Sequence, residues 1–350
     1  MKSLLDGVVI EAVSTALPST LQKLDEGFLG ISSEEIAKIT NITGIKQVAI
    51  SSKSTTSSDL CANAANLLLK SNPLYFSEIE AIIFVSQSRD FLLPSTSSIL
   101  QHKLGLSNDC LCLDVPSGCT GYLHGLFLAQ SFVASGACNK VLLLCGETNS
   151  KLINKGDRSV SMIFGDGGSA TVLGKKPGIK SFFNFKTDGA GYDKIIVPDG
   201  GYRNPFNSES LNPIKFEDGN KRRSLDMKMD GMSVFNFSIS LVPKLVAESL
   251  ADCALTAESL DLFAAHQANK LIVNQLSKKC GFSSTQSPFL ASNFGNTGPA
   301  SIPLLLSEGF AEKNHSLKKV MMCGFGVGLN WGTCVTDLSH TKIYQTQLFA

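Results

Sequence analysis

The feature that most constrains this chain is a regular alternation between short apolar runs and longer segments with helical periodicity. Runs such as EAIIFVSQS (80–88) and KVLLLCGE (140–147) contain five consecutive apolar residues, AIIFV and VLLLC, which is typical of parallel strands covered on both faces. The segments between such runs carry apolar residues every three or four positions, as helices do. In the first half this pattern predicts helices over 57–70, 94–105 and 119–134 and strands over 80–88, 110–115 and 140–147. An α/β protein with parallel sheet follows.

The second half of the chain repeats the same order of elements. It predicts helices over 230–253, 267–281 and 300–313, a strand over 261–267, and two strands within 318–338 around a glycine-rich loop. Pro243 is expected to kink or interrupt the first of these helices. A coarse repeat of this size predicts two similar halves packed together, which we place at 1–175 and 176–350.

Composition excludes several classes of protein. With 350 residues, 43% of them hydrophobic, the chain can bury a large core. A net charge of +1 lacks the excess of basic residues that is typical of nucleic-acid-binding proteins. No apolar run reaches the length of a membrane span, and Asp6 and Glu11 interrupt any signal-peptide core. The ten cysteines form no CxxC pair and no metal-ligand cluster. We therefore expect a cytoplasmic protein without a bound metal, in which nine cysteines pack as small hydrophobic residues.

The tenth cysteine, Cys119, stands apart because it lies in the corner VPSGCTGYLHGL between a predicted strand and a predicted helix. Free N–H groups at a helix start stabilise a thiolate, and Gly118 and Gly121 permit the close approach of a ligand. Such a corner suits a nucleophile. A cysteine that merely fills space at a helix start fits this stretch equally well.

Two further polar residues occupy comparable positions in the second half. His266 follows the apolar run LDLFAA, and Asn296 lies in the irregular loop NFGNTGPAS. Each taken alone is commonly structural, His266 as a buried core residue and Asn296 as a turn former. Reactive groups of α/β proteins collect at the carboxyl ends of strands, so pseudo-twofold packing of the halves would bring Cys119, His266 and Asn296 into one cleft. The loop GFGVGLNWG (324–332) adds backbone N–H groups for an oxyanion.

These motifs resemble the β-ketoacyl-acyl-carrier-protein synthase III family of thiolase-superfamily condensing enzymes. The resemblance rests, in the family's order, on GCTG (118–121), FGDGGSA (164–170), MDGMSVFNF (229–237), HQAN (266–269), FGNTGPAS (294–301) and GFGVGLNWG (324–332). It implies a thiolase-like, five-layered αβαβα fold, usually a homodimer without metal or prosthetic group. The implied substrates are acyl-coenzyme A or acyl-carrier thioesters, and the implied partner is acyl carrier protein.

The resemblance also implies roles for individual residues. Cys119 would accept the acyl group, and His266 and Asn296 would bind the carbonyl of a malonyl thioester that loses CO2 to give the attacking carbanion. One oxyanion would be held by the N–H of Cys119 together with an N–H from the 326–328 segment. The residues expected to contact substrate are Gly326, Val327, Gly328, Phe235, Asn269 and Leu93, the last supplied by a dimer partner.

The chain departs from the family pattern where donor and carrier are recognised. Lys38 and Ile42 stand where the family has a tryptophan and an arginine that sandwich the adenine of coenzyme A. Leu271 replaces the family's carrier-docking arginine, with Lys270 beside it. We therefore expect Lys270 and the run Lys221, Arg222 and Arg223 to dock an acidic carrier by charge. A solvated loop accounts for that run equally well.

Three interpretations of the activity follow from these residues. The first is decarboxylative condensation of an acyl thioester with malonyl on a carrier. The second keeps the acyl-cysteine and transfers the acyl group to an amine or a hydroxyl. The third, a non-catalytic partner subunit, is disfavoured because such subunits typically lose one of the three polar residues, all present here. The acyl chain, its donor and the pathway stay open.

Overall fold

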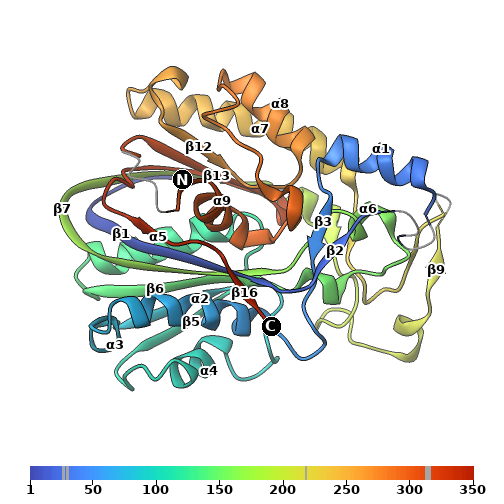
Figure 1. Cartoon of the computed structure of the whole chain (residues 1–350), viewed down its shortest axis with the longest axis horizontal. Helices are drawn as coiled ribbons and strands as arrows, with labels where there is room; N and C mark the ends of the chain where they lie inside the picture. Colours follow the sequence, from blue (N-terminus) through green and yellow to red (C-terminus); the bar gives the residue numbers. More distant parts are fainter. Residues whose placement is uncertain (26–27, 29–30, 217–218, 312–316) are drawn as a thin grey trace.

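The structure is a computed structural model that describes residues 1–350 except 26–27, 29–30, 217–218 and 312–316. Helices and sheets alternate in five layers, with α5 and α9 between the two sheets (Figure 1). One outer layer holds α2 (Ser57–Ser71), α3 (Tyr75–Glu78) and α4 (Thr96–Lys103); the middle holds α5 (Gly121–Ala134) and α9 (Ser301–Phe310); the other outer layer holds α7 (Gly231–Asp252) and α8 (Lys270–Cys280). This is the αβαβα order that the resemblance implied.

The sheet of the first half is parallel at its edge and antiparallel toward the centre. β4 (Ala81–Val85) pairs in parallel with β5 (Leu111–Val115) and with β6 (Lys140–Glu147). β6 then pairs antiparallel with the first part of β7 (Gly167–Thr187). The three strands predicted for the first half are therefore parallel, as expected, whereas the antiparallel β7 was not among the predicted strands.

The sheet of the second half follows the same plan. β12 (Leu262–Ala265) is parallel to β13 (Val320–Gly326). β14 (Asn330–Thr336) is antiparallel to β13 because only the short turn 327–329 joins them, and a parallel neighbour needs a long crossover. β14 also pairs antiparallel with residues 182–187 of β7.

One long strand pair joins the two sheets. β1 (Lys2–Pro18) runs antiparallel along β7, from Lys2 opposite Asn184 to Ala16 opposite Gly168. Near the chain end, β15 (Lys342–Ile343) and β16 (Gln347–Phe349) pair in parallel with β1. The position 175/176, where we placed the boundary between the halves, falls inside β7. The halves therefore share backbone instead of meeting across a linker.

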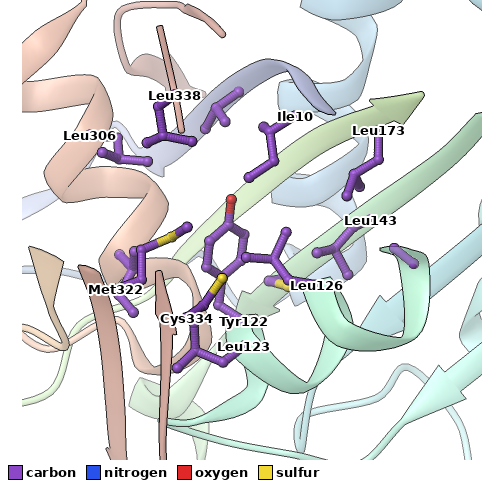
Figure 2. Close-up of a cluster of buried hydrophobic side chains, with 14 of the residues drawn as sticks. Ile10, Tyr122, Leu123, Leu126, Leu143, Leu173, Leu306, Met322, Cys334 and Leu338 are labelled. Atoms are coloured by element: carbon purple, nitrogen blue, oxygen red, sulfur yellow. The ribbon is translucent and has the colours of Figure 1, made fainter. Parts of the chain in front are cut away.

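Side-chain alternation along the strands explains the layers. In β4, Ile83 faces the central cluster around α5 and α9, whereas Ile82 and Phe84 face α2 and α4. A strand buried on both faces must be apolar at every position, which is the pattern seen in the sequence. Figure 2 shows the central layer, in which Tyr122 of α5 lies between Leu306 of α9 and Leu143 of β6.

Most predicted helices occur within a few residues of their predicted bounds, and the differences have local causes. α4 begins at Thr96 because the Asp114 carboxylate accepts the N–H groups of Thr96 and Ser97, at 2.7 and 2.8 Å. α8 begins at Lys270, since the Asn269 side chain caps it by accepting the N–H of Ile272 at 2.9 Å. Of the helix predicted over 300–313, residues 312–313 lie outside the described part.

Of the kink or interruption predicted at Pro243, the interruption is not found, because α7 runs unbroken through this residue. A proline leaves the carbonyl four residues earlier without its helical partner. Here that carbonyl belongs to Ile239, and it accepts a hydrogen bond from Lys279 Nζ at 3.0 Å. In the described part of the chain α7 is also the helix whose length and composition would fit a membrane span. Its apolar residues pack on β13 and β14, as an outer-layer helix requires.

Short elements cover one end of the layers (Figure 1). They form three antiparallel pairs and two helices. These are β2 (Leu21–Lys23) with β3 (Gln47–Ala49), β8 (Ile195–Ile196) with β11 (Lys228–Met229), β9 (Ile214–Lys215) with β10 (Lys221–Arg222), α1 (Ser33–Thr43) and α6 (Arg158–Ser161). Residues of this end form part of the wall of the cavity described next.

Candidate active site

A cavity of ≈ 360 Å³ opens between the two halves. Its lining includes Cys119, His266 and Asn296, three residues separated by up to 177 positions in the sequence (296 minus 119). Phe235, Asn269 and Gly326 line the same cavity. The lining residues that the structure describes include no lysine, arginine, aspartate or glutamate. The predicted convergence of the three polar residues is therefore found, in apolar surroundings.

Cys119 lies between β5 and α5, where glycine backbones crowd it. A Cβ placed on Gly326 would lie 2.7 Å from both Cβ and Sγ of Cys119, so only glycine fits there, and its φ of +154° also favours glycine. A Cβ on Gly118 would lie 2.5 Å from Gln87 Oε1. These close approaches explain the glycines of the GCTG and GFGVG motifs.

The expected stabilisation of a Cys119 thiolate is not found in the free protein. Burial raises the pKa of the Cys119 thiol to about 11, against the lowering effect of the Val327 backbone N–H. The main cause is desolvation, because Cys119 is buried just before α5, which begins at Gly121 with Thr120 as its cap.

Asn296 is held so that its amide nitrogen remains available. Its Oδ1 accepts the N–H of Gly298 at 3.0 Å, and its backbone N–H donates to Ile163 at 2.8 Å. A Cβ on Gly165 would lie 1.9 Å from the carbonyl oxygen of Phe294, which explains the glycine of the FGDGG motif. Because the oxygen of the side chain is occupied, its NH2 group is the part that can donate to a ligand.

His266 follows β12 and is 1% exposed. Its Nδ1 lies 2.6 Å from Ser301 Oγ, and its Nε2 has no partner among the described residues. Burial lowers the pKa of the imidazole to about 3, so the ring is neutral at ordinary pH. The Phe325 ring packs against it edge-on at 5.5 Å. A neutral imidazole with one unoccupied nitrogen is suited to hydrogen bonding with a substrate oxygen.

Glu147 is a buried acid near the site that sequence reasoning missed. It ends β6 in CGET, which matches no motif, and is 2% exposed. Its carboxylate accepts the N–H groups of Gln87 and Ser88, at 2.7 and 3.0 Å, and the Ser88 hydroxyl at 2.6 Å. Burial raises its pKa to about 7, and its charge in turn helps to raise the pKa of Cys119.

The remaining substrate-contact residues are placed as follows. Val327 presents its N–H to Cys119, and Gly328 has a φ of +72° that allows the turn to β14. Leu93 is 83% exposed on the loop after β4 and does not line the cavity of its own chain. Its contribution from a second copy stays a prediction.

The basic residues assigned to carrier docking divide into two groups. Lys221 and Lys270 are exposed. Arg222, by contrast, is only 8% exposed and pairs through Nε with the fully buried Asp157 at 2.7 Å. The docking role predicted for Arg222 is therefore wrong, because its charge is already neutralised inside the protein. Arg223 is half-buried and pairs with Asp226 at 2.7 Å.

Among the described residues, no three His, Cys, Asp or Glu side chains lie close enough together to bind a metal ion. The site is built instead from a thiol, a neutral imidazole and an amide. On a five-layered fold made of two similar halves, this combination defines a condensing enzyme of the thiolase type.

Comparison with known proteins supports the assignment to the condensing enzymes. Residues 113–191 match the family model for 3-oxoacyl-[acyl-carrier-protein (ACP)] synthase III, and residues 250–338 match its C-terminal model. The chain is 33% identical to the β-ketoacyl-[acyl-carrier-protein] synthase III of Natranaerobius thermophilus, covering 85% of this chain and 89% of that protein. With the synthase III of Lactococcus lactis the identity is 32%, over 88% and 95% of the two chains.

A solved structure is similar over the full length. The 3-oxoacyl-(acyl-carrier protein) synthase from Burkholderia xenovorans superimposes with a TM-score of 0.93 at 32% identity, covering 100% of this chain and 99% of that one. The chain belongs to the 3-oxoacyl-[acyl-carrier-protein] synthase III family and is an acyl-transferring condensing enzyme.

Proposed function

We propose that this enzyme loads an acyl group onto Cys119 and condenses it with a malonyl group on a carrier thioester, with loss of CO2. In the first step the Cys119 sulfur attacks the thioester carbonyl as its proton departs. The thiol of coenzyme A or of the carrier leaves and takes up a proton. The N–H groups of Cys119 and Val327 would hold the oxyanion, and the lowering effect of both on the pKa of the Cys119 thiol supports this role.

In the second step the malonyl thioester loses CO2 and its electron pair passes to the thioester enolate. His266 Nε2–H and the Asn296 NH2 group donate to the enolate oxygen. The enolate carbon then forms a bond with the acyl carbon of acyl-Cys119, and the cysteine sulfur leaves. The cavity lining supports this step, because among the described lining residues there is no lysine or arginine to stabilise the malonyl carboxylate as an ion pair before it is lost.

The hydrogen bonds of His266 and Asn296 are the main support for this proposal. Nδ1 of His266 is bonded to Ser301 and Oδ1 of Asn296 to Gly298, so each side chain keeps one nitrogen that can bind a substrate. Two neutral donors in one apolar cavity match an enolate oxygen that develops negative charge. Transfer to an amine or hydroxyl, the second interpretation, would not call for two such donors beside the nucleophile.

Incubation with a panel of acyl thioesters, followed by intact-mass analysis, tests the first step. We expect one acyl adduct in the wild type and none in Cys119→Ser, with Cys145→Ser as a control that keeps the adduct. Cys145 is suited to this control because it is fully buried in β6. An undiminished adduct in Cys119→Ser would refute the nucleophile. Acyl transfer to an amine or hydroxyl without CO2 would favour the second interpretation.

We further propose a homodimer that works in the cytoplasm. All ten cysteines are unpaired, which supports a reducing compartment. Phe91, Leu92 and Leu93 are 60%, 61% and 83% exposed on one loop, an apolar surface that a second copy would cover while supplying Leu93 to the acyl pocket. Sedimentation of the wild type and of Leu92→Asp tests this, and a wild-type monomer would contradict it.

The proposed carrier site is reduced to two lysines. Lys221 and Lys270 remain exposed, so they can steer an acidic carrier toward the cavity, whose lining reaches Asn269 and Leu271 on either side of Lys270. Because exposed charges are screened by salt, a docking role makes KM for a carrier-bound substrate rise with ionic strength.

A further inference from the structure

The hydrogen bond between His266 and Ser301 has a direction that the protons of the two groups determine. Ser301 is the first residue of α9 and is 1% exposed. Its backbone N–H bonds to Gly298, and its hydroxyl makes one hydrogen bond among the described residues, to His266 Nδ1 at 2.6 Å. His266 Nε2 is buried without a partner. The neutral ring holds a single N–H, so the proton sits on either Nδ1 or Nε2.

The two arrangements differ in how many buried groups they leave unsatisfied. If Nδ1–H donates to Ser301, the serine proton has no acceptor and the Nε2 lone pair has no donor. If the serine hydroxyl donates to Nδ1, the serine proton has its acceptor, and the one group left without a partner is the Nε2–H of a residue that lines the ligand cavity. A buried polar group without a partner costs about 1–3 kcal/mol, so the second arrangement is the more stable one.

We infer that Ser301 is a positioning residue: its hydroxyl donates to Nδ1 and thereby fixes the His266 proton on Nε2, as the enolate step requires. The link to the enolate rests on the proposed function, whereas the tautomer itself does not. Ser301 does not line the cavity, so it acts through His266 and not on substrate.

The α9 helix offers a matched control. Ser307 is also a buried serine of α9, 3% exposed, and its hydroxyl has no hydrogen-bond partner among the described residues. Ser301→Ala and Ser307→Ala therefore remove the same atom from the same helix, but only the first removes a bond to His266. Any effect confined to Ser301→Ala comes from that bond.

The tautomer can be read directly from ¹H–¹⁵N spectra of protein labelled at histidine nitrogen, with His266 assigned by its loss in His266→Gln. We expect the wild type and Ser307→Ala to carry the proton on Nε2. Ser301→Ala should shift toward a mixture of tautomers, and Ser301→Thr, which keeps a hydroxyl, should restore Nε2–H. A wild-type ring protonated on Nδ1 would overturn the inference whatever the variants do.

Kinetics provide the second readout. Ser301→Ala removes one hydrogen bond that orients the imidazole, so kcat for condensation should fall roughly tenfold while acylation of Cys119 stays unchanged. Unchanged condensation in Ser301→Ala, with its tautomer preserved, would refute a positioning role. If the wild type fails to condense at all, the proposed function fails, while the spectra still decide the tautomer.

Discussion

The burial of His266 predicts a specific dependence of stability on pH. The imidazole pKa is about 3 in the folded protein because of burial, against an ordinary value of 6.5. Below pH 6.5 the unfolded chain takes up a proton on this ring and the folded protein does not. The stabilisation is therefore complete above pH 6.5 and is lost as pH falls toward the folded pKa. From the two values, the loss at pH 5 is about 2 kcal/mol.

The perturbation that isolates this effect is His266→Gln, which removes the ring without adding a titrating group. Urea unfolding of wild type and variant at pH 7.5 and pH 5.0 gives the comparison, and other titrating groups such as Glu147 are present in both proteins. Trp331 is the single tryptophan and is 7% exposed in β14, so its fluorescence reports unfolding. We expect the wild type to lose about 2 kcal/mol relative to the variant between the two pH values. If the difference in free energy of unfolding between wild type and His266→Gln is the same at pH 7.5 and at pH 5.0, the imidazole is not buried in its neutral form.

Two further predictions concern the nucleophile and the basic segment. Gly326→Ala should slow acylation of Cys119 roughly a hundredfold, the scale of losing an oxyanion donor, because its Cβ would displace the sulfur. Gly178→Ala, with a φ of +85° and open space around it, should leave the intact-mass acylation rate unchanged, and equal rates in both variants would contradict the steric argument. Arg222→Ala should lower the free energy of unfolding in urea by about 3–5 kcal/mol, since it leaves a buried carboxylate unpaired. Lys221→Glu should change the free energy of unfolding by no more than about 0.5 kcal/mol but raise KM for a carrier-bound substrate at low salt. A destabilised Lys221→Glu with unchanged KM, beside a stable Arg222→Ala, would refute the assignment of Arg222 to stability and of Lys221 to docking.

Much of the fold could be predicted because the burial of strand and helix faces gives the apolar residues a regular spacing in the sequence. β4 is apolar at each position since both its faces are covered, and α2 shows helical spacing because one side of it faces a sheet. α5 is apolar over most of its surface because it lies between the two sheets. His266 was identifiable because it directly follows such a run, and Cys119 and Asn296 because they lie in glycine-containing segments outside any run. β7 was not predicted as a strand, and the direction of β14 was not identified, because periodicity reports which faces are buried and not which way a strand runs.

Long-range partners account for the other differences. Arg222 looked like a surface charge in the run KRR, but Asp157 neutralises it from 65 positions away (222 minus 157). Pro243 looked like a helix breaker until Lys279, from the neighbouring helix, satisfied the carbonyl that it left free. The pKa of Cys119 depends on desolvation by both halves of the fold, which a local helix-start rule does not include.

The central claim is that acyl-Cys119 is consumed by a carbanion formed through His266 and Asn296. A single-turnover experiment tests it most directly: enzyme acylated beforehand is mixed with a malonyl-carrier thioester, and CO2, the acyl-enzyme mass and the product are followed together. The wild type should release one CO2 per acyl group lost and give a β-ketoacyl product, whereas His266→Ala and Asn296→Ala should retain the acyl-enzyme. Loss of the acyl group without CO2, or variants that decarboxylate normally but cannot be acylated, would contradict the account.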